Sequence, residues 1–408
     1  MHTLMISDVY FPRINGVSTS IETFRQALGR HGVSSTLIAP AYPAGPASDG
    51  DDIVRIPSHY LPIDPEDRIM QRRHIRALLP RLREHPPALV HAQTPFIAHY
   101  AGLELAQALG VPCVGTYHTF FEEYLYHYVR YAPRRWMRAL ARDFSRRQCN
   151  ALDAVIVPSS AMRDTLTRYG VTTPLHVLPT GIPCAGFHGG DGAQFRQRYG
   201  IDASRKVLLF VGRVAHEKNI ELLLEATAAL RARHPEVLLV ITGEGPALSA
   251  LRAHSRRLGI DDHVRFLGYL DRHRELHDCY RAADLFVFAS RTETQGLVLL
   301  EAMAMGTPVV ALAKMGTCDI LNPERGCRIA PDSASGFAAV VDELLNDAPL
   351  RQRLAVEAHA YARTWSAEAM GERLVALYRQ WGGLPASDET ATDAVTAPDD
   401  PCYLMSLR

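Results

Sequence analysis

The 408-residue sequence has little of what marks several classes of protein. Its seven cysteines are scattered, with no Cys-x-x-Cys pair and no metal-ligand spacing, so neither a disulfide scaffold nor a metal cluster is predicted. No apolar run approaches the length that crosses a membrane, and the amino terminus lacks the basic segment of a secretory signal. We therefore expect a cytosolic protein that touches a membrane, if at all, only from its surface.

An excess of one charge is also missing. The 44 basic residues are matched by 44 acidic residues, and the resulting net charge of zero gives no global indication of a nucleic-acid partner. Lysine is scarce, with Lys206, Lys218 and Lys314 its only occurrences, and we interpret the excess of arginine as compositional bias. The length and the 47% hydrophobic content are those of a soluble chain with two or three domains.

Short apolar runs alternate with helix-forming segments along most of the chain. The first series of runs lies at 4–6, 36–39, 53–56, 88–91, 112–115, 154–157 and 176–178. The second series lies at 207–211, 237–241, 264–267, 285–288 and 309–312. This alternation predicts an α/β fold with two mostly parallel sheets that carry helices on both faces. The Pro- and Gly-rich segment 179–186 separates the two series, and we interpret it as a hinge.

The most informative stretch follows the apolar run at 285–288. Gly296 and Leu297 open a segment of helix formers that stops before Gly306, so backbone N–H groups at its start would face an anion. Open parallel sheets bind ligands at the carboxyl ends of their strands. Glu293 in the loop and Glu301 on the helix are carboxylates, which suit the paired hydroxyls of a sugar. Together these features predict a sugar-nucleotide site.

The spacing and surroundings of Glu293 and Glu301 resemble the E-x7-E signature of retaining glycosyltransferases with the GT-B fold, in the large family 4. The resemblance covers roughly residues 3–380. It implies two Rossmann-like domains facing across a cleft, with Glu293 near the hydroxyls of the donor sugar and Glu301 holding the ribose. The alternative is that Glu293 only stabilises a helix amino terminus and that Glu301 is a solvated helix residue.

The resemblance also implies a domain organisation. An acceptor- and membrane-facing domain is expected at 1–180 and a donor-binding domain at 181–363. A helix within 364–382 would then cross back to the first domain, since 366–381 is amphipathic. The acidic tail 383–408, rich in Ala, Asp, Thr and Pro, is expected to be disordered.

Two cations follow the first strand of the second series. Arg213 and Lys218 would lie at the carboxyl end of this strand, where cations stabilise the negative charge that develops on a departing nucleoside diphosphate. The resemblance implies the same role for both residues. The alternative is a pair of ordinary surface charges. No metal or other cofactor is expected, because the sugar nucleotide is a co-substrate.

Further candidates rest mainly on the resemblance. It places Gly16 beside the donor diphosphate, Gly243 near the donor and His118 opposite the donor sugar. For the two glycines the alternative is a simple turn, and for His118 it is a structural or surface histidine. Residues 315–319, Met-Gly-Thr-Cys-Asp, replace the Gly-Gly-x-x-Glu loop of relatives, which leaves the diphosphate contacts there open.

The acceptor is indicated by two local matches and one physical pattern. Residues 293–296, Glu-Thr-Gln-Gly, and 117–124 resemble diacylglycerol glucosyltransferases. On a helix over 134–148, one face is apolar and the other basic. The apolar face holds Trp136, Met137, Leu140, Ala141 and Phe144; the basic face holds Arg134, Arg135, Arg138, Arg142 and Arg146, with Arg147 intruding on the apolar side. A second basic amphipathic stretch runs over 68–83, and the alternative for each is an ordinary surface helix.

The sequence therefore predicts a retaining, metal-independent glycosyltransferase. Its expected reaction moves glucose from UDP-glucose to diacylglycerol at an anionic membrane surface, with the enzyme peripheral on the cytosolic face. The first alternative is a mannosyl- or galactosyltransferase acting on a polyprenyl-linked or oligosaccharide acceptor. The second is a sugar-nucleotide epimerase or hydrolase with a similar fold. The nucleotide base, the sugar, the linkage position and the oligomeric state stay open.

Overall fold

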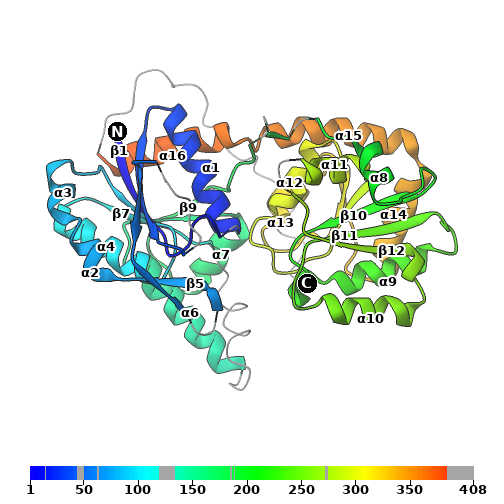
Figure 1. The fold of residues 1–408 in the computed structure, drawn as a ribbon, viewed down its shortest axis with the longest axis horizontal. Helices are drawn as coiled ribbons and strands as arrows, with labels where there is room; N and C mark the ends of the chain where they lie inside the picture. Colours follow the sequence, from blue (N-terminus) through cyan, green and yellow to red (C-terminus); the bar gives the residue numbers. More distant parts are fainter. Residues whose placement is uncertain are drawn as a thin grey trace, which may run out of the picture.

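The structure, a computed structural model, describes residues 1–13, 15–43, 50–61, 64–118, 134–183, 186–187, 189–271 and 274–383. Figure 1 shows two α/β halves side by side, each built around its own sheet. The orange helices α15 (Ala348–Arg363) and α16 (Ala367–Trp381) run along the top of that view, from the second half back to the first.

The first half contains a seven-stranded parallel sheet in the order β3-β2-β1-β6-β7-β8-β9 among the described residues. The strands are β1 (His2–Ile6), β2 (Ser34–Pro40), β3 (Ile53–Ile56), β6 (Val90–Ala92), β7 (Cys113–Thr116), β8 (Ala154–Val157) and β9 (Leu175–Val177). Each apolar run of the first series overlaps one of these strands. Strands covered on both faces require continuous apolar runs, and the side chains of β8, for example, are all buried.

Helices and one hairpin surround this sheet. They are α1 (Gly16–Arg30), α2 (Arg72–Arg76), α3 (Leu79–Glu84), α4 (Ile97–Leu109), α6 (Arg134–Asn150), α7 (Ser160–Arg168) and the antiparallel pair β4 (Ser58–Leu61) and β5 (Asp64–Met70). The basic stretch over 68–83, which the sequence shows interrupted by Pro80, does not form one helix. Its first residues end β5, and two short helices follow. Arg72 and Arg76 form ion pairs with Glu104 of α4, so part of this charge is used within the half.

The second half contains a six-stranded parallel sheet in the order β12-β11-β10-β13-β14-β15 within the described ranges. The strands are β10 (Lys206–Val211), β11 (Val237–Thr242), β12 (Val264–Gly268), β13 (Leu285–Phe288), β14 (Val309–Ala311) and β15 (Cys327–Ile329). The second series of apolar runs predicts all but β15, which is only three residues long. The helices are α8 (Gly192–Arg198), α9 (Ile220–Leu230), α10 (Leu248–Leu258), α11 (Glu275–Ala282), α12 (Leu297–Ala304), α13 (Thr317–Leu321), α14 (Ala334–Asn346) and α15.

Both sheets reverse their strand order once. In the first sheet, β1 pairs with β2 on one side and β6 on the other; in the second sheet, β10 pairs with β11 and β13. The loops after two such neighbouring strands turn in opposite directions, which leaves a crevice at the carboxyl ends of the strands. The loops after β10 and β13 carry Lys218 and Glu293, so this reversal positions the candidate site.

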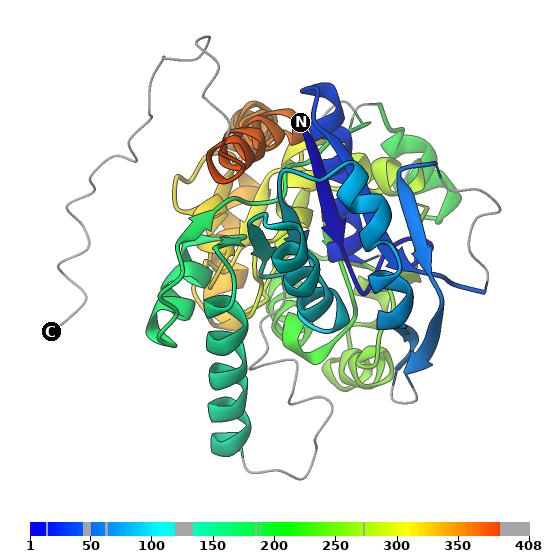
Figure 2. The same ribbon diagram turned by 90° about the vertical axis from the view of Figure 1, so that its left-hand side faces the viewer.

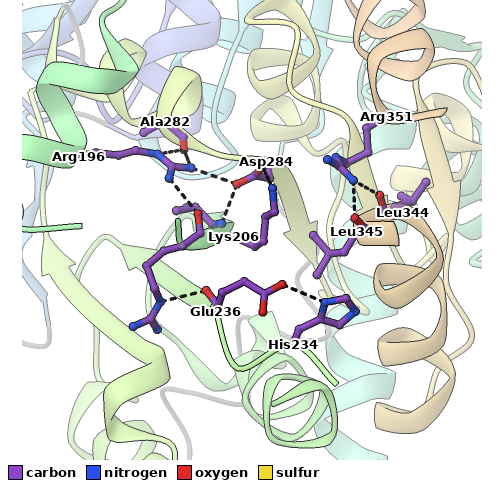
Figure 3. A network of polar contacts seen from close by, with 11 residues as sticks. Arg196, Lys206, His234, Glu236, Ala282, Asp284, Leu344, Leu345 and Arg351 are labelled. Atoms are coloured by element: carbon purple, nitrogen blue, oxygen red, sulfur yellow. Dashed lines mark hydrogen bonds and ion pairs between the residues drawn. The ribbon is translucent and has the colours of Figure 1, made fainter. Parts of the chain in front are cut away.

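A polar network lies at the amino ends of the strands of the second sheet, which is the end away from the candidate site (Figure 3). The Asp284 carboxylate, just before β13, accepts hydrogen bonds from the Arg196 guanidinium at 3.0 Å and from the Val207 N–H at 2.9 Å, and it lies 3.8 Å from the Lys206 ammonium. Arg196 also donates to the carbonyl of Ala282. These bonds hold the starts of β10 and β13 together, so the amino ends of the strands have a structural role.

The chain crosses between the halves at two adjacent segments. The Ile182 N–H donates to the Trp365 carbonyl at 2.9 Å, and the Ala367 N–H donates to the Ile182 carbonyl at 2.8 Å. A Cβ at Gly181 would lie 2.5 Å from the Ser366 carbonyl oxygen, so only glycine allows this close approach. Beyond the crossing, Met370, Leu374 and Tyr378 of α16 are buried in the core of the first half.

Helix α6 extends beyond the rest of the first half at its amino end (Figure 2). Of the predicted apolar face, Met137 and Ala141 are buried against the half's own core, with Phe144 packed beside them. Trp136 and Leu140 are instead 74% and 65% exposed. The helical wheel is correct, but the apolar residues divide between the core and the surface.

Close packing of α16 on α1 gives a stability prediction. A Cβ at Gly371 would lie 2.4 Å from the Ala27 Cβ, so Gly371→Ala should overpack this contact and destabilise the fold by about 1–3 kcal/mol. The matched control is Gly29→Ala on α1, where a Cβ meets no described atom within 4 Å and should stabilise the helix by about 0.5–1 kcal/mol. Chemical denaturation measures both, and a Gly371→Ala protein as stable as wild type would show that the helices can separate freely.

Candidate active site

The loop after β10 is held against the end of β13. Asn219 adopts a left-handed conformation, with φ of 53°, and its Nδ2 donates to the Ala289 carbonyl at 3.1 Å. The Ser290 hydroxyl also donates to the Glu217 carbonyl, at 3.3 Å. These bonds connect the loops on both sides of the strand-order reversal. They therefore fix the position of Lys218, which lies between Glu217 and Asn219.

Lys218 and Glu293 meet in this crevice. The Lys218 ammonium donates to Glu293 Oε2 at 2.5 Å, and the two side chains are only 20% and 18% exposed. The ammonium also lies 6.0 Å from the centroid of the Phe288 ring. A charge pair with reduced access to water interacts more strongly than a surface pair. The structure thus brings together two predicted site residues that are 75 positions apart.

Arg213 lies in the same loop but at the surface. Its side chain is 62% exposed, and its guanidinium lies 3.8 Å from the Glu217 carboxylate. A pair so long and so exposed contributes little to stability. Arg213 can therefore change partners at small cost when an anion enters the crevice.

Glu301 lies on α12, the helix that follows the Glu293 loop. Gly296, at φ of 95°, precedes the helix, and this left-handed conformation favours glycine. The Glu301 side chain is buried, and the residue is 5% exposed. The Tyr280 hydroxyl donates to Glu301 Oε2 at 2.8 Å and fixes one of its oxygens. Glu301 is therefore not a solvated helix residue, because its carboxyl group is buried, where a polar group needs hydrogen-bond partners.

The two candidate glycines have different surroundings. A Cβ at Gly243, at φ of 112°, would lie 2.0 Å from the Gly212 carbonyl oxygen, so the packing of two neighbouring loops already requires glycine there. Gly16 is the first residue of α1, after Asn15, whose side chain caps the helix together with Ser18. A Cβ at Gly16 would meet no described atom within 4 Å, so packing within the described chain does not require glycine at this position.

His118 lies just beyond β7 in the first half. Its Nε2 lies 3.2 Å from the side-chain amide oxygen of Gln93, the residue that follows β6. Burial lowers the pKa of His118 to about 4, because the imidazolium loses its hydration there. At neutral pH, His118 is therefore an uncharged imidazole. It can form hydrogen bonds, but it does not supply positive charge.

No sequence pattern indicates the role of Asp8. Its carboxylate accepts hydrogen bonds from the Thr94 hydroxyl at 2.8 Å and from the Ala98 N–H at 3.1 Å. Burial raises the pKa of Asp8 to about 6 despite these bonds. Asp8 thereby joins the loops after β1 and β6, which flank the strand-order reversal of the first sheet.

Residues 315–319, a turn and the first residues of α13, contact the first half. The Asp319 carboxylate accepts a hydrogen bond from the Ser160 N–H at 2.7 Å and another from the Ser160 hydroxyl, at the start of α7. Met315 packs against a core cluster of the first half. The Gly316 N–H donates to the Glu293 carbonyl at 2.9 Å, so this loop is also tied to the candidate site. The sequence shows the departure from the family pattern here but not this bridging contact.

Comparison with known proteins follows the same division of the chain. The model of the family Glycosyltransferase Family 4 matches residues 14–185, and that of Glycosyl transferases group 1 matches residues 191–360. Alpha-monoglucosyldiacylglycerol synthase of Streptococcus pneumoniae is 34% identical over 75% of this chain and 70% of its own length. A GDP-mannose-dependent alpha-mannosyltransferase of Mycobacterium tuberculosis is 28% identical over 80% of this chain and 83% of its own.

A solved structure shows the same fold. HepE of Anabaena, in complex with UDP and glucose, superposes with a TM-score of 0.73 over 93% of this chain and 100% of its own, at 18% identity. The fold is therefore the predicted GT-B arrangement of two Rossmann-like halves. With both halves matched, the chain belongs to the family 4 (group 1) glycosyltransferases, and it is a glycosyltransferase.

Within the described residues, no helix combines the length and the apolar character needed to span a bilayer.

The neutral state of His118 can be tested directly by NMR. Because burial lowers its pKa to about 4, its ring signals should not shift between pH 8 and pH 5, whereas an exposed histidine titrates near 6.5. The unfolded chain takes up this proton near pH 6.5, so His118 makes the fold less stable as the pH falls from about 6.5 towards 4. His118→Asn identifies the signal, and a midpoint near 6.5 would contradict the burial argument.

Proposed function

We propose that this glycosyltransferase acts with retention of configuration and transfers glucose from UDP-glucose to diacylglycerol. The observation that carries the proposal is the Lys218–Glu293 pair after β10 and β13, with Arg213 exposed in the loop of Lys218 and Glu301 buried on the helix that follows Glu293. A cation and two carboxylates at a strand-order reversal suit a diphosphate joined to two sugars.

The donor roles follow from the chemistry of each group. Lys218 and Arg213 stabilise the charge that develops on the leaving diphosphate, so no metal ion is required for this purpose. Glu293 lies at the sugar end, where it accepts hydrogen bonds from hydroxyls, and Glu301 accepts those of the ribose. Backbone N–H groups at Gly296 and Leu297 face the phosphates. The UDP and glucose bound to HepE support a uridine nucleotide as the donor.

Residues of the first half complete the proposed donor site. Gly16 begins α1 beside the diphosphate, and the neutral imidazole of His118 faces the sugar with a hydrogen bond instead of a charge. Gly243 contributes mainly by letting the loops after β10 and β11 pack closely. Retention of configuration is an expectation from family membership, with the departing diphosphate accepting the proton of the acceptor hydroxyl.

The acceptor is supported by separate observations. The related synthase of Streptococcus pneumoniae is named for a monoglucosyldiacylglycerol product. Near the amino end of α6, Trp136 and Leu140 are exposed, and Arg138 is exposed on the basic face of the same helix. Large apolar side chains beside arginine suit the headgroup region of an anionic membrane. We therefore propose that the enzyme is peripheral and docks on the cytosolic leaflet through α6.

The membrane residues are not equivalent. Arg134 and Arg135 begin α6, but their side chains lie outside the described residues. The Arg142 guanidinium lies 5.4 Å from the centroid of the Tyr169 ring of its own half, so part of its interaction is internal. Arg146 is paired with Asp143 at 2.7 Å. We assign the strongest lipid contact to the end of the helix that carries Trp136 and Arg138.

A second candidate function is mannosyl transfer, because the mannosyltransferase relative is aligned over 80% of this chain. The test is to incubate the protein with labelled UDP-glucose, UDP-galactose or GDP-mannose, with and without diacylglycerol vesicles. The proposal predicts an α-linked glucosyl lipid from UDP-glucose alone. A lipid product from GDP-mannose would establish the second candidate, and epimerised or released sugar without lipid would indicate an epimerase or hydrolase.

A matched pair of variants connects this activity to the crevice. Lys218→Met removes the cation and should lower kcat about 10²- to 10³-fold, with a smaller effect on donor binding. Lys206→Met removes the same charge at the amino end of β10, next to Asp284, and should leave kcat near the wild-type value. Equal kcat for Lys218→Met and wild type would refute the leaving-group role.

Membrane docking gives a further prediction. Arg134/Arg135/Arg138→Ser should weaken binding to anionic liposomes roughly a hundredfold, at about 1 kcal/mol per arginine near the surface. The control Arg256/Arg257/Arg265→Ser removes the same charge from exposed positions of the second half and should bind like wild type. Sedimentation at 0.1 M and 1 M salt should show the attraction fading, because the Debye length falls from about 10 Å to 3 Å. Equal binding by both triple variants would contradict docking through α6.

A further inference from the structure

The side-chain amide of Gln295 lies between Glu293 and Gly296 but points to a different part of the chain. Its Oε1 accepts the Thr180 N–H at 2.9 Å, and its Nε2 donates to the Thr180 carbonyl at 2.7 Å. The residue is 7% exposed, and both bonds are buried. One side chain of the candidate donor loop therefore satisfies both backbone groups of a residue that is 115 positions earlier in the chain.

Thr180 in turn contacts the first half. Its hydroxyl oxygen lies 2.6 Å from that of Ser20, a buried residue of α1. Thr180 also directly precedes Gly181 and Ile182, at the paired crossings between the halves. The loop with Glu293 and the helix that begins at Gly16 are thus fixed to the same residue. These are the second-half and first-half sides of the proposed donor site.

The chemistry of this contact requires an amide. The contact needs one donor and one acceptor about 2–3 Å apart, and a glutamine side chain supplies both. A glutamate carboxylate would accept the Thr180 N–H but would place a second acceptor against the Thr180 carbonyl. A protonated glutamic acid would again supply an O–H donor and a carbonyl acceptor. A methionine of similar size would supply neither and would leave two buried backbone groups unpaired.

We propose that Gln295 is a positioning residue for glycosyl transfer: by binding the Thr180 backbone, it sets the placement of the Glu293 loop relative to α1. It acts through Glu293 and Gly16 and does not itself contact substrate. The inference rests on the proposed function in one respect, which is that Glu293 and Gly16 line one donor site. A displacement of about 1 Å at a reacting group lowers turnover on the order of a hundredfold, so kcat depends on this contact.

The kinetic test compares Gln295→Glu and Gln295→Met with wild type between pH 8 and pH 5.5, using the donor and acceptor that wild type turns over. Both variants should lose about tenfold to a hundredfold in kcat at pH 8, with a smaller change in nucleotide affinity. As the pH falls, Gln295→Glu should recover relative to wild type because its carboxyl becomes protonated, whereas Gln295→Met should not. Gln26→Glu and Gln26→Met, at an exposed position of α1 where the amide donates to Glu22, are the matched controls and should have wild-type kcat at each pH.

Wild-type kcat in either Gln295 variant at pH 8, or an equal deficit of both at every pH, would overturn the proposal. If neither variant folds, Thr180→Val replaces the hydroxyl that contacts Ser20 and keeps the backbone; it must lower kcat severalfold, and unchanged kcat would also overturn the proposal.

A second measurement does not depend on the reaction. Hydrogen exchange at the Thr180 amide should be faster in Gln295→Met than in wild type, because its acceptor is lost. Equal protection would refute the contact in solution. If wild type fails to turn over UDP-glucose and diacylglycerol, the proposed function fails. The exchange measurement still decides whether Gln295 binds the Thr180 backbone in solution.

Discussion

The arrangement of the two halves depends on one short piece of paired backbone, where residue Ile182 bonds with Trp365 and Ala367. Both passages of the chain between the halves occur at this point. The proposed donor site draws on residues of each half, so its geometry is set here and at two smaller contacts. These are the bonds of Gln295 with Thr180 and of Asp319 with Ser160.

Electrostatics within the second half follow from the sheet. Because β10 and β13 are neighbouring strands, the residues that follow them lie close together. Lys218 and Glu293 therefore meet although they are far apart in the sequence. Their pairing keeps a cation at the carboxyl ends of these strands, where the two side chains are only 20% and 18% exposed. An entering diphosphate would compete with Glu293 for Lys218, and this exchange would release the carboxylate towards the sugar hydroxyls. The two side chains can therefore pair with each other without ligand and bind the donor when it enters.

The sequence predicts local features well and long-range contacts poorly. Continuous apolar runs predict the parallel strands because strands covered on both faces need them, and the Glu293–Glu301 spacing identifies the family. The burial of Glu301 and its bond with Tyr280 follow from packing that no spacing encodes. The bonds of Gln295 and Asp319 span 115 and 159 residues, so no local pattern could reveal them. On α6, the wheel separates apolar from basic residues but does not separate core contacts from surface exposure.

The most direct test of this account is calorimetric titration with UDP. Glu301→Gln removes the negative charge but keeps an acceptor for the Tyr280 hydroxyl, so the fold should be retained. Loss of charge-assisted hydrogen bonds to the ribose should weaken UDP binding about tenfold to a hundredfold relative to wild type. Glu225→Gln, at an exposed position of α9, should bind UDP like wild type. Equal UDP affinity of Glu301→Gln and wild type, with both folded, would contradict the assignment of this crevice as the nucleotide site.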